Sequence, residues 1–416
     1  AHAARLAAAR DYGALVEAPA GQVLMPGFVD LHVHAPQFPQ LGTALEVPLE
    51  TWLARHTFPL EARYADLAFA DRAYRRLVDG LLANGTTTAL YFATIHQPAT
   101  ERLAEICLEK GQRALVGRTA MDDPNLCPPD YRDASVRQAI DETAAFVDFV
   151  EGHGGNRAGR VMPVVTPRFI PACTDALLEG LDELAGRCRC HVQTHASESD
   201  WEHRFVLERT GRTDTLALGA FGLLGRRTVL AHGVFLDDGD MAAIAAAGAG
   251  IAHCPLSNAY FSDAAFPLRT ALDKGLHVGL GTDIAGGPDA SMLANVRWAV
   301  ATARLRESGV DATLAREKRG TPGARVGFAE AFWMATAGGG IALDLPVGVI
   351  APGYRFDAIL VDPEAADGDV TIFPDLDGPE AIFQKIVYGA TRANIRRVFV
   401  DGRTVVDKDA TLGRRH

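Results

Sequence analysis

The feature that most constrains this chain is a repeated alternation of short, apolar, β-branched runs with longer stretches rich in alanine and leucine. Such an alternation predicts successive βα units whose strands form a parallel sheet. We expect eight strands: Gly27–His34, Thr86–Ala93, Arg113–Met121, Val161–Phe169, His191–Ser197, Val229–Gly233, Gly250–Cys254 and His277–Asp283. Helices are expected between them: Ala65–Ala83, Thr100–Lys110, Ser135–Glu151, Thr174–Arg187 and Asp238–Ala247, the last with a start signal at Asp237 and Asp238. Eight such units predict an α/β fold, a closed (β/α)₈ barrel of the TIM type.

The sequence changes character after the eighth predicted unit. Short strands are predicted there, with a hairpin signal at Asp401-Gly402 inside the last of them: Val347–Gly353, Asp357–Val361, Ile386–Tyr388 and Val398–Val406. These segments predict a small β domain, with which the N-terminal segment leading into the barrel is expected to pair. The predicted domains are residues 1–26 (first part of the small β domain), 27–345 (barrel) and 346–416 (second part of the small β domain).

Length and composition fit this organisation. The chain has 416 residues, of which 48% are hydrophobic and 22% charged, as in a globular protein with a large core. The formal net charge is −11 and no basic stripe is present, which argues against a nucleic-acid ligand. No apolar run reaches the length of about 18 residues that a membrane-spanning helix needs. The six cysteines show no C-x-x-C pair and no disulfide pattern, which predicts a reduced, cytoplasmic setting.

Residues with metal-binding side chains stand at the ends of four predicted strands. His32 and His34 end the first strand, two residues apart and therefore on the same face. His195 ends the fifth strand, His232 the sixth and Asp283 the eighth. A lone His-x-His pair is a weak signal, because two such histidines are more often packing or surface residues. Four matching strand ends together favour a functional site at one mouth of the barrel.

These residue types indicate a catalytic metal site. Zinc prefers imidazole nitrogen and carboxylate oxygen, and a catalytic zinc keeps one position open for water. His32, His34, His195 and Asp283 are the predicted ligands of one zinc ion per chain, although the same donors also suit iron. Bound zinc lowers the pKa of water to about 7 and so provides a nucleophile for hydrolysis.

A hydrolysis that releases an amine also needs a proton donor beside the metal. Glu198, three residues after His195, is the predicted general acid and base. Asp283 can bind the metal and also accept a proton from the water. His232 can polarise the attacked bond or orient the water, can bind the metal, or can be a packed structural histidine, and the sequence leaves these roles open. His253 is given no metal role, because the predicted coordination is already complete.

Together these motifs resemble the amidohydrolase superfamily and, within it, the guanine deaminases. The resemblance spans nearly the whole chain and rests on these segments: Met25–Gln37, Thr51–Pro59, Asn84–Thr88, Tyr91–His96, Thr166–Phe169, His195–Glu198, Ala231–Gly233, Ala252–Asn258 and Gly279–Gly287. It implies a barrel with a small flanking β-sandwich built from both chain ends, and a homodimer. It also implies zinc-dependent hydrolytic deamination of guanine to xanthine and ammonia, as in guanine catabolism.

The resemblance further implies which residues hold a purine. Gln37 and the Arg168-Phe169 pair match residues that bind the base in guanine deaminases. Arg168 can donate to the purine carbonyl, Phe169 can lie against the ring, and Gln37 offers both a donor and an acceptor. Trp52 is expected to wall the pocket, and His232 to contact the substrate. The alternative for Arg168 is a surface ion pair.

Two segments depart from the family pattern. Ala1–Gly21 is too short and too rich in alanine to supply all the N-terminal strands, so the small β domain is expected to be incomplete. Phe261–Phe266 differs from the family, which bears on fine substrate selection.

Other functions stay open at this level. The same machinery could deaminate a pterin or 8-oxoguanine or hydrolyse a triazine, because metal ligands do not distinguish these heterocycles. A non-catalytic scaffold barrel is a remote alternative that the complete ligand set disfavours. The cytidine-deaminase type of zinc site needs a C-x-x-C sequence, which this chain lacks.

Overall fold

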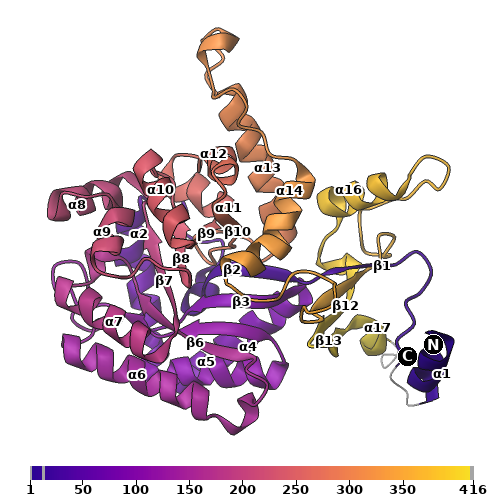
Figure 1. The fold of residues 1–416 in the computed structure, drawn as a ribbon, viewed down its shortest axis with the longest axis horizontal. Helices are drawn as coiled ribbons and strands as arrows, with labels where there is room; N and C mark the ends of the chain where they lie inside the picture. Colours follow the sequence, from indigo (N-terminus) through magenta and orange to yellow (C-terminus); the bar gives the residue numbers. More distant parts are fainter. Residues whose placement is uncertain (1, 12–14, 413–416) are drawn as a thin grey trace.

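The computed structural model describes residues 2–11 and 15–412, and its centre is a parallel barrel (Figure 1). The barrel strands are β2 (Phe28–His34), β3 (Thr86–Phe92), β4 (Arg113–Gly117), β6 (Val161–Pro167), β7 (His191–Ala196), β8 (Thr228–His232), β9 (Gly250–His253) and β10 (His277–Leu280). The ring closes between its two ends, where the Asp283 amide donates to the His32 carbonyl at 2.8 Å and the His34 amide donates to the Ile284 carbonyl at 2.9 Å. The predicted TIM-type barrel is confirmed, and each predicted segment forms its strand.

Helices connect the strands and cover the outside of the barrel (Figure 1). The longer ones are α4 (Leu67–Ala83), α5 (Gln97–Lys110), α6 (Val136–Gly152), α7 (Asp175–Cys188), α8 (Asp200–Thr210), α10 (Asp238–Ala247) and α13 (Met292–Ser308). Side-chain caps fix where they begin: Asp66 accepts from the Ala68 amide, and Asp237 forms a reciprocal capping box with Asp240. No helix within the described ranges is both long and apolar enough to cross a membrane.

Shorter helices, one short strand and a π-helical turn complete the structure. They are α1 (His2–Asp11), α2 (Leu49–Trp52), α3 (Phe58–Ala62), the strand β5 (Thr119–Ala120), α9 (Asp214–Ala220), α11 (Pro255–Ser257), the π-helical turn η6 (Asn258–Ser262), α12 (Leu268–Asp273), α14 (Phe328–Trp333), α15 (Gly339–Ala342) and α17 (Lys408–Leu412). Three of them follow the carboxyl ends of barrel strands: α2 and α3 come after β2, and η6 comes after β9.

The two ends of the chain build one small antiparallel sheet, as predicted. Its strands, in spatial order, are β1 (Val23–Pro26), β11 (Ala358–Val361), β12 (Ile395–Val400) and β13 (Arg403–Asp407). Asp401 and Gly402 join β12 to β13 with φ of +48° and +73°, the backbone that a type I′ hairpin turn requires at both central residues. The boundaries of the domains at residues 26/27 and 345/346 stay a prediction.

Two of the strands predicted for this region were wrong. Ile386–Tyr388 lies inside helix α16 (Pro379–Gly389), which begins with a proline at its first position and packs against α14 through Phe383 and Phe332, whose ring centroids are 5.1 Å apart. A three-residue apolar run cannot distinguish a strand from the buried face of a helix. Val347–Gly353 is irregular, because Gly348 and Gly353 adopt φ of +77° and +89° and so interrupt an extended strand.

A buried ion-pair cluster joins the barrel to the small sheet. Arg113 at the start of β4 donates to Asp357 at 2.9 Å and to Asp401 at 2.6 Å, and only 3% of its side chain is exposed. Arg160, just before β6, also pairs with Asp401 at 3.3 Å. Because Asp357 and Asp401 flank strands of the small sheet, this cluster fixes the sheet against the amino-terminal end of the barrel.

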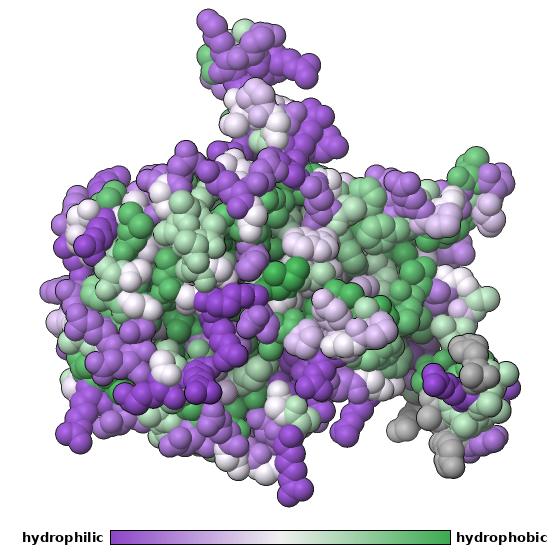
Figure 2. Space-filling view, viewed as in Figure 1, coloured by the Kyte–Doolittle hydropathy of each residue, from purple (hydrophilic) through white to green (hydrophobic). Residues whose placement is uncertain are grey.

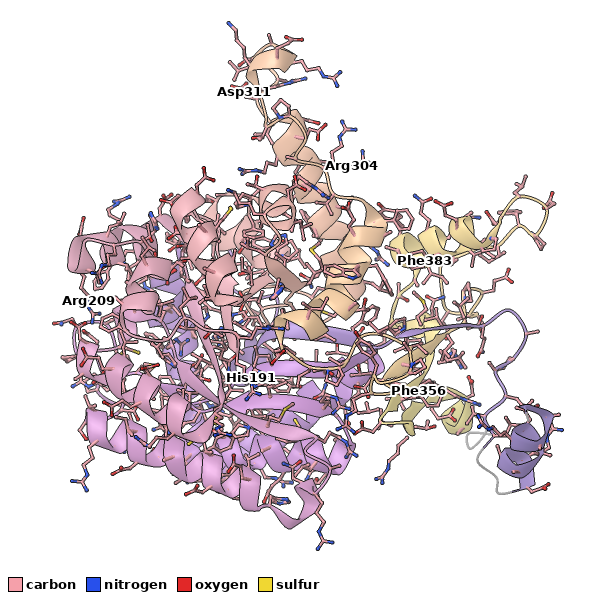
Figure 3. All side chains as sticks on the ribbon, viewed as in Figure 1. His191, Arg209, Arg304, Asp311, Phe356 and Phe383 are labelled. Carbon is pink, nitrogen blue, oxygen red and sulfur yellow. The ribbon has the colours of Figure 1, made fainter. Side chains whose placement is uncertain are left out.

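The rest of the surface includes an arm that projects from α13 (Figure 1). Arg304 lies on its helical part and Asp311 further out (Figure 3), and the arm folds back where the Thr321 amide donates to the Arg306 carbonyl at 2.8 Å. The end of this arm is mostly hydrophilic (Figure 2). His191 begins β7, and its ring nitrogen Nε2 is hydrogen-bonded to the Leu343 carbonyl at 2.7 Å, at the opposite end of the strand from His195.

Candidate active site

Side chains from four strand ends converge at the carboxyl-terminal mouth of the barrel. The Nε2 atoms of His34 and His195 face each other at 2.9 Å. His32 Nε2 lies 3.2 Å from Asp283 Oδ1, and His34 Nε2 lies 3.6 Å from the same oxygen. His232 Nε2 is 3.9 Å from Asp283 Oδ2. The structure therefore brings together all five residues predicted from the strand ends, in a site where each is buried.

This donor set fits a divalent metal ion. Three overlapping groups have ligand atoms close enough to share an ion: His32 with His195 and His232; His32 with His34 and Asp283; and Glu198 with His232 and Asp283. His32 Nε2 is buried and has no hydrogen-bond partner among the described residues, which leaves a costly orphan atom unless a ligand satisfies it. His253, which was given no metal role, belongs to none of the three groups.

Burial keeps these imidazoles neutral, the form that binds metals. It lowers the pKa of His32, His34 and His195 well below the usual value, and the neighbouring histidines lower it further. His195 Nδ1 is paired with the Arg168 carbonyl at 2.5 Å, so the proton sits on Nδ1 and the lone pair of Nε2 points into the site.

His232 is oriented in the same way by a residue that the sequence analysis assigned no role. The Asn258 Oδ1 atom, in η6, accepts from His232 Nδ1 at 3.0 Å. Nε2 of His232 is buried without a partner in the described parts of the chain and faces Glu198 Oε1 at 3.6 Å. His232 Nε2 thus lies near two carboxyl groups of the site, at 3.6 Å from Glu198 and 3.9 Å from Asp283.

Glu198 lies just beyond the end of β7 and is 6% exposed. Burial raises the pKa of its carboxyl well above the usual value, and the nearby charge of Asp283 raises it further. Burial also raises the pKa of Asp283. A raised pKa favours the protonated carboxyl, which can deliver a proton, and its conjugate base can accept one, as a general acid and base must.

The backbone around these residues is held in an uncommon conformation. Ser197, His232 and Asp283 have φ of +53°, +77° and +49°, in the left-handed region that residues other than glycine seldom adopt. Each stands at or just after the end of a barrel strand. Backbone strain of this kind persists where surrounding contacts over-determine it, and it is common at functional sites.

A small inner pocket opens beside the donor set. It is lined by His34, Gln37, Leu49, Trp52, Leu53, Arg168, Phe169, His195, Glu198, Phe261, Asp283 and Gly286. Every residue predicted to contact a substrate, except His232, therefore borders it. His232 does not line the pocket but lies next to Glu198 and Asp283, which do.

Arg168 is not a surface residue but half of a buried ion pair. Its Nη1 and Nη2 atoms donate to the two carboxyl oxygens of Glu61 at 2.7 and 3.1 Å, and its guanidinium lies 4.9 Å from the centroid of the Phe58 ring. Gln37 Nε2 donates to Glu61 at 2.9 Å, while its Oε1 accepts from the Ala285 amide at 3.2 Å. Glu61 was missed, because a single glutamate in an apolar segment carries no signal of a partner 107 residues away.

Aromatic side chains form the remaining wall. The Trp52 ring lies 5.0 Å from the Phe261 ring, and the Phe169 ring lies 6.1 Å from that of His195. Trp52 Nε1 is buried with no partner among the described residues, so it is a donor available to a ligand. Phe261 lies in the segment that departs from the family pattern, and the structure adds it to the pocket.

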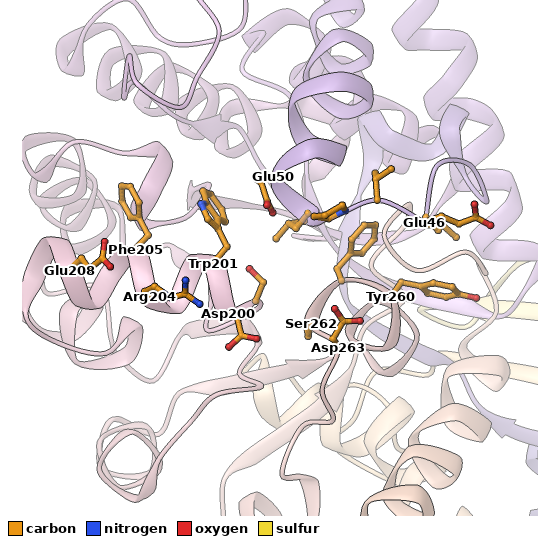
Figure 4. Close-up of a pocket in the computed structure, with 16 residues that line it drawn as sticks. Glu46, Glu50, Asp200, Trp201, Arg204, Phe205, Glu208, Tyr260, Ser262 and Asp263 are labelled. Atoms are coloured by element: carbon orange, nitrogen blue, oxygen red, sulfur yellow. The ribbon is translucent and has the colours of Figure 1, made fainter. Parts of the chain in front are cut away.

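An open cleft of about 730 Å³ lies outside this inner pocket (Figure 4). Trp201, Arg204 and Phe205 of α8 line one side, and Tyr260 and Asp263 line the other (Figure 4). Leu49 and Phe261 border both cavities. The cleft is therefore the natural approach from solvent to the buried donor set.

Comparison with known proteins agrees with this geometry. The model of the Amidohydrolase family matches residues 23–405. The chain belongs to the amidohydrolase family. The family predicted from the motifs is confirmed. The matched range spans all the residues of the candidate site described above.

Individual amidohydrolases extend the comparison. Guanine deaminase of Homo sapiens is 38% identical over 392 residues, which cover 92% of this chain and 83% of that protein. Guanine deaminase of Dictyostelium discoideum is 36% identical over 388 residues, or 92% and 82% of the two chains. The structure is also similar to a crystal structure of guanine deaminase from C. acetobutylicum with bound guanine in the active site, with a TM-score of 0.84, 28% identity, and coverage of 95% and 90%.

Proposed function

We propose that this amidohydrolase hydrolyses guanine to xanthine and ammonia. One observation carries the proposal: a metal-type donor set, a buried glutamic acid and a polar cluster suited to a purine edge border a single pocket. Similarity to guanine deaminases over 92% of the chain supports the same substrate. No contact in the site favours a pterin, 8-oxoguanine or a triazine over guanine.

The proposal includes one zinc ion, held by His32, His34, His195 and Asp283. A zinc ion held by these residues would supply Lewis acidity and lower the pKa of a bound water molecule to about 7. The fit rests on the inward-facing Nε2 atoms of the histidines and on the distance of 3.2 Å between His32 Nε2 and Asp283 Oδ1. His232, held by Asn258, orients the attacking water and contacts the substrate.

Glu198 moves the protons of the reaction. It accepts a proton from the attacking water, whose oxygen bonds to carbon 2 of guanine, and passes that proton to ring nitrogen 3. The hydroxyl now on carbon 2 then gives up its remaining proton, which Glu198 passes to the exocyclic nitrogen. The bond between carbon 2 and this nitrogen breaks, ammonia leaves, and carbon 2 becomes the carbonyl carbon of xanthine. The raised pKa of Glu198 suits both transfers, and Asp283 assists as the second acceptor.

Recognition of the purine falls to the opposite side of the pocket. Arg168 and Gln37, both tied to Glu61, present donors to the carbonyl edge of guanine. Because Glu61 already accepts two bonds from Arg168, the guanidinium is fixed in place and loses little side-chain entropy when the substrate binds. Phe169 and Trp52 supply flat apolar surfaces for the ring.

The test is a direct assay. Purified protein is incubated with guanine, and xanthine and ammonia are both measured, alongside equal concentrations of a pterin, 8-oxoguanine and a triazine. We expect equimolar xanthine and ammonia, and a kcat/KM for guanine above that for each other compound. Faster turnover of another heterocycle would reassign the substrate, and metal-loaded protein that turns over none of them would favour the scaffold alternative.

A further inference from the structure

Two buried carboxyl groups contact the segment that carries Glu198 without lining the inner pocket. Glu202 is the third residue of α8 and Asp214 is the first residue of α9, and both side chains are 0% exposed. Neither borders the inner pocket or belongs to a group that could hold a metal ion among the described residues. Burying two carboxyl groups together is costly, so their position calls for a physical reason.

Both carboxyl groups accept hydrogen bonds from the short segment that carries Glu198, and Asp214 Oδ2 also pairs with His203 Nδ1 at 3.3 Å. Glu202 Oε2 accepts from the backbone amide of Glu198 itself at 2.7 Å. Asp214 Oδ2 accepts from the Ser197 hydroxyl at 3.1 Å. Asp214 also lies close enough to Glu202 for its charge to raise the pKa of the Glu202 carboxyl. The two carboxyl groups thus hold the consecutive residues Ser197 and Glu198, and Ser197 has the left-handed backbone described above.

The bond from Glu202 departs from the usual pattern at a helix start. Ser199 caps α8 and accepts from the Glu202 amide at 3.2 Å, which makes Ser199 to Glu202 the Ser-x-x-Glu sequence of a capping box. In a capping box the glutamate returns a bond to the amide of the capping residue itself. Here it reaches one residue further back, to Glu198, so the interaction serves the segment ahead of the helix.

The remaining oxygens show how the pair is stabilised. Glu202 Oε1 and Asp214 Oδ1 are buried and have no hydrogen-bond partner among the described residues. A proton on Glu202 would let its carboxyl donate to the neighbouring Asp214, which avoids the cost of burying an unpaired charge. Burial and the neighbouring Asp214 raise the pKa of Glu202 well above its usual value, in agreement with a protonated Glu202.

We propose that Glu202 and Asp214 are positioning residues, two adjacent carboxyl groups that hold the Ser197–Glu198 turn through their hydrogen bonds and thereby aim the Glu198 carboxyl at the reacting atoms. Neither residue touches the substrate. The proposal rests on the proposed role of Glu198 as general acid and base. It predicts that removing the pair lowers kcat, because a displacement of about 1 Å in a catalytic group can cost on the order of 100-fold in rate.

The test compares two substitutions at one position. In Glu202→Gln the side-chain carbonyl can still accept from the Glu198 amide, and its NH₂ group can donate to Asp214. In Glu202→Ala both bonds are lost. We expect Glu202→Gln to keep kcat within about threefold of wild type, and Glu202→Ala to lose about 10–100-fold in kcat with KM and metal content little changed.

Asp240→Ala is the matched control. Asp240 is also a 0% exposed carboxylate at the third position of a helix. It accepts from the Asp237 amide at 3.1 Å and from the hydroxyl of Thr213, which caps α9, so it holds the starts of α10 and α9 without a hydrogen bond to Ser197 or Glu198. We expect Asp240→Ala to lower the unfolding temperature without the kcat loss of Glu202→Ala. Any of three results would overturn the proposal. The first is an equal kcat loss in Glu202→Ala and Asp240→Ala, the second is an unchanged kcat in Glu202→Ala, and the third is an equal kcat loss in Glu202→Gln and Glu202→Ala.

A second readout separates this inference from the proposed function. Hydrogen exchange of the Glu198 amide, followed by mass spectrometry on peptides covering residues 195–202, needs no turnover. Glu202→Ala should speed this exchange, and Glu202→Gln and Asp240→Ala should leave it near wild type. If wild-type protein fails to deaminate guanine, the function is wrong and the exchange data still decide the positioning. If it deaminates guanine and exchange is unchanged in Glu202→Ala, the positioning alone is wrong.

Discussion

At the scale of single residues, burial decides the chemistry of this site. Each donor at the barrel mouth is nearly inaccessible to water, so histidines stay neutral and the Glu198 carboxyl tends to hold its proton. Hydrogen bonds from outside the donor set then select one orientation for each ring, through the Arg168 carbonyl for His195 and through Asn258 for His232. Neutral, oriented imidazoles beside a protonatable carboxyl are what a metal-assisted hydrolysis requires.

Replacing Glu198 tests the proton path. Glu198→Gln preserves the size of the side chain but cannot carry a proton, so we expect kcat for guanine to fall by about 10²–10⁴-fold with the metal retained. Turnover and metal content are measured on the same sample. The control is Glu208→Gln, at an exposed residue of the following helix α8 that lines the outer cleft, and it should change neither. Near-normal turnover in metal-loaded Glu198→Gln would assign the proton transfer to Asp283 or His232.

Replacing Arg168 tests recognition and must be separated from folding. Arg168→Ala leaves the Glu61 carboxylate, which is 0% exposed, without its bidentate partner, and we expect about 3–5 kcal/mol of stability to be lost. Catalysis should fall as well, with a decrease in kcat/KM equivalent to about 2 kcal/mol or more.

The double variant Arg168→Met, Glu61→Leu removes both charges. It should recover most of the stability measured by urea unfolding but none of the guanine turnover, because the donors for the purine carbonyl are still absent. Recovery of turnover together with stability would remove Arg168 from recognition.

At the scale of elements, strand ends and their junctions determine where function and stability lie. The carboxyl ends of the strands carry the site, whereas the opposite end of the barrel carries the cluster of Arg113, Arg160, Asp357 and Asp401. That division is usual for parallel barrels, in which the amino-terminal face serves stability. The small sheet thus packs on the face that catalysis does not use.

Asp401→Asn tests this junction and its pH dependence. Asparagine tolerates the positive φ of this position, so the change removes mainly charge. Burial tends to raise the pKa of Asp401, but its ion pairs with Arg113 and Arg160 outweigh this and lower the pKa below the ordinary 3.8. The stabilisation is therefore fully present above pH 3.8 and is lost as the pH falls through the lower, folded-state value.

We expect Asp401→Asn to lose about 1–3 kcal/mol at pH 7 and pH 5 in urea unfolding, and the difference from wild type to shrink below pH 4. Asp141→Asn is the control, because the Arg137–Asp141 pair is exposed, at 90% and 68% of the two side chains. It should cost no more than about 0.5 kcal/mol at any pH. A loss for Asp401→Asn that does not depend on pH would show that the charge is not what stabilises the junction.

At the scale of the whole molecule, the site links distant parts of the chain. Its predicted metal donors come from β2, β7 and the segment after β10, so a bound ion would tie together the two sides along which the barrel closes. An ion that binds the folded chain and not the unfolded one stabilises it, by about 2.7 kcal/mol at 100 times the dissociation constant. The homodimer stays a prediction, for which light scattering of the purified protein is the measurement.

Metal removal tests this linkage without reference to turnover. Chelation should lower the midpoint of thermal unfolding, and added zinc should restore it in proportion to the logarithm of free zinc. In His195→Ala, which loses one predicted donor, the same zinc addition should raise the midpoint less. Equal midpoints before and after chelation, with mass spectrometry confirming that the metal has gone, would contradict a metal site in the barrel.

The sequence by itself determined the parts of this protein that local pattern encodes. The eight barrel strands follow from apolar runs between helical stretches, the hairpin follows from Asp401-Gly402, and His32, His34, His195, His232 and Asp283 follow from polar residues where such runs stop. Parallel strands bring their carboxyl ends to one mouth, so knowing the strand ends was enough to assemble the donor set.

Only the tertiary structure decided the contacts whose partners are remote in sequence or outside the strand ends. Arg168 with Glu61 and His232 with Asn258 join segments that no periodicity relates, and the Glu202–Asp214 pair depends on how α8 and α9 pack. The helix that contains Ile386–Tyr388 was decided in the same way, by the neighbours that cover its apolar face. The local sequence pattern indicates whether a side chain is buried. Which partner a buried polar group bonds to, or which neighbours cover a buried apolar group, depends on packing across the whole fold.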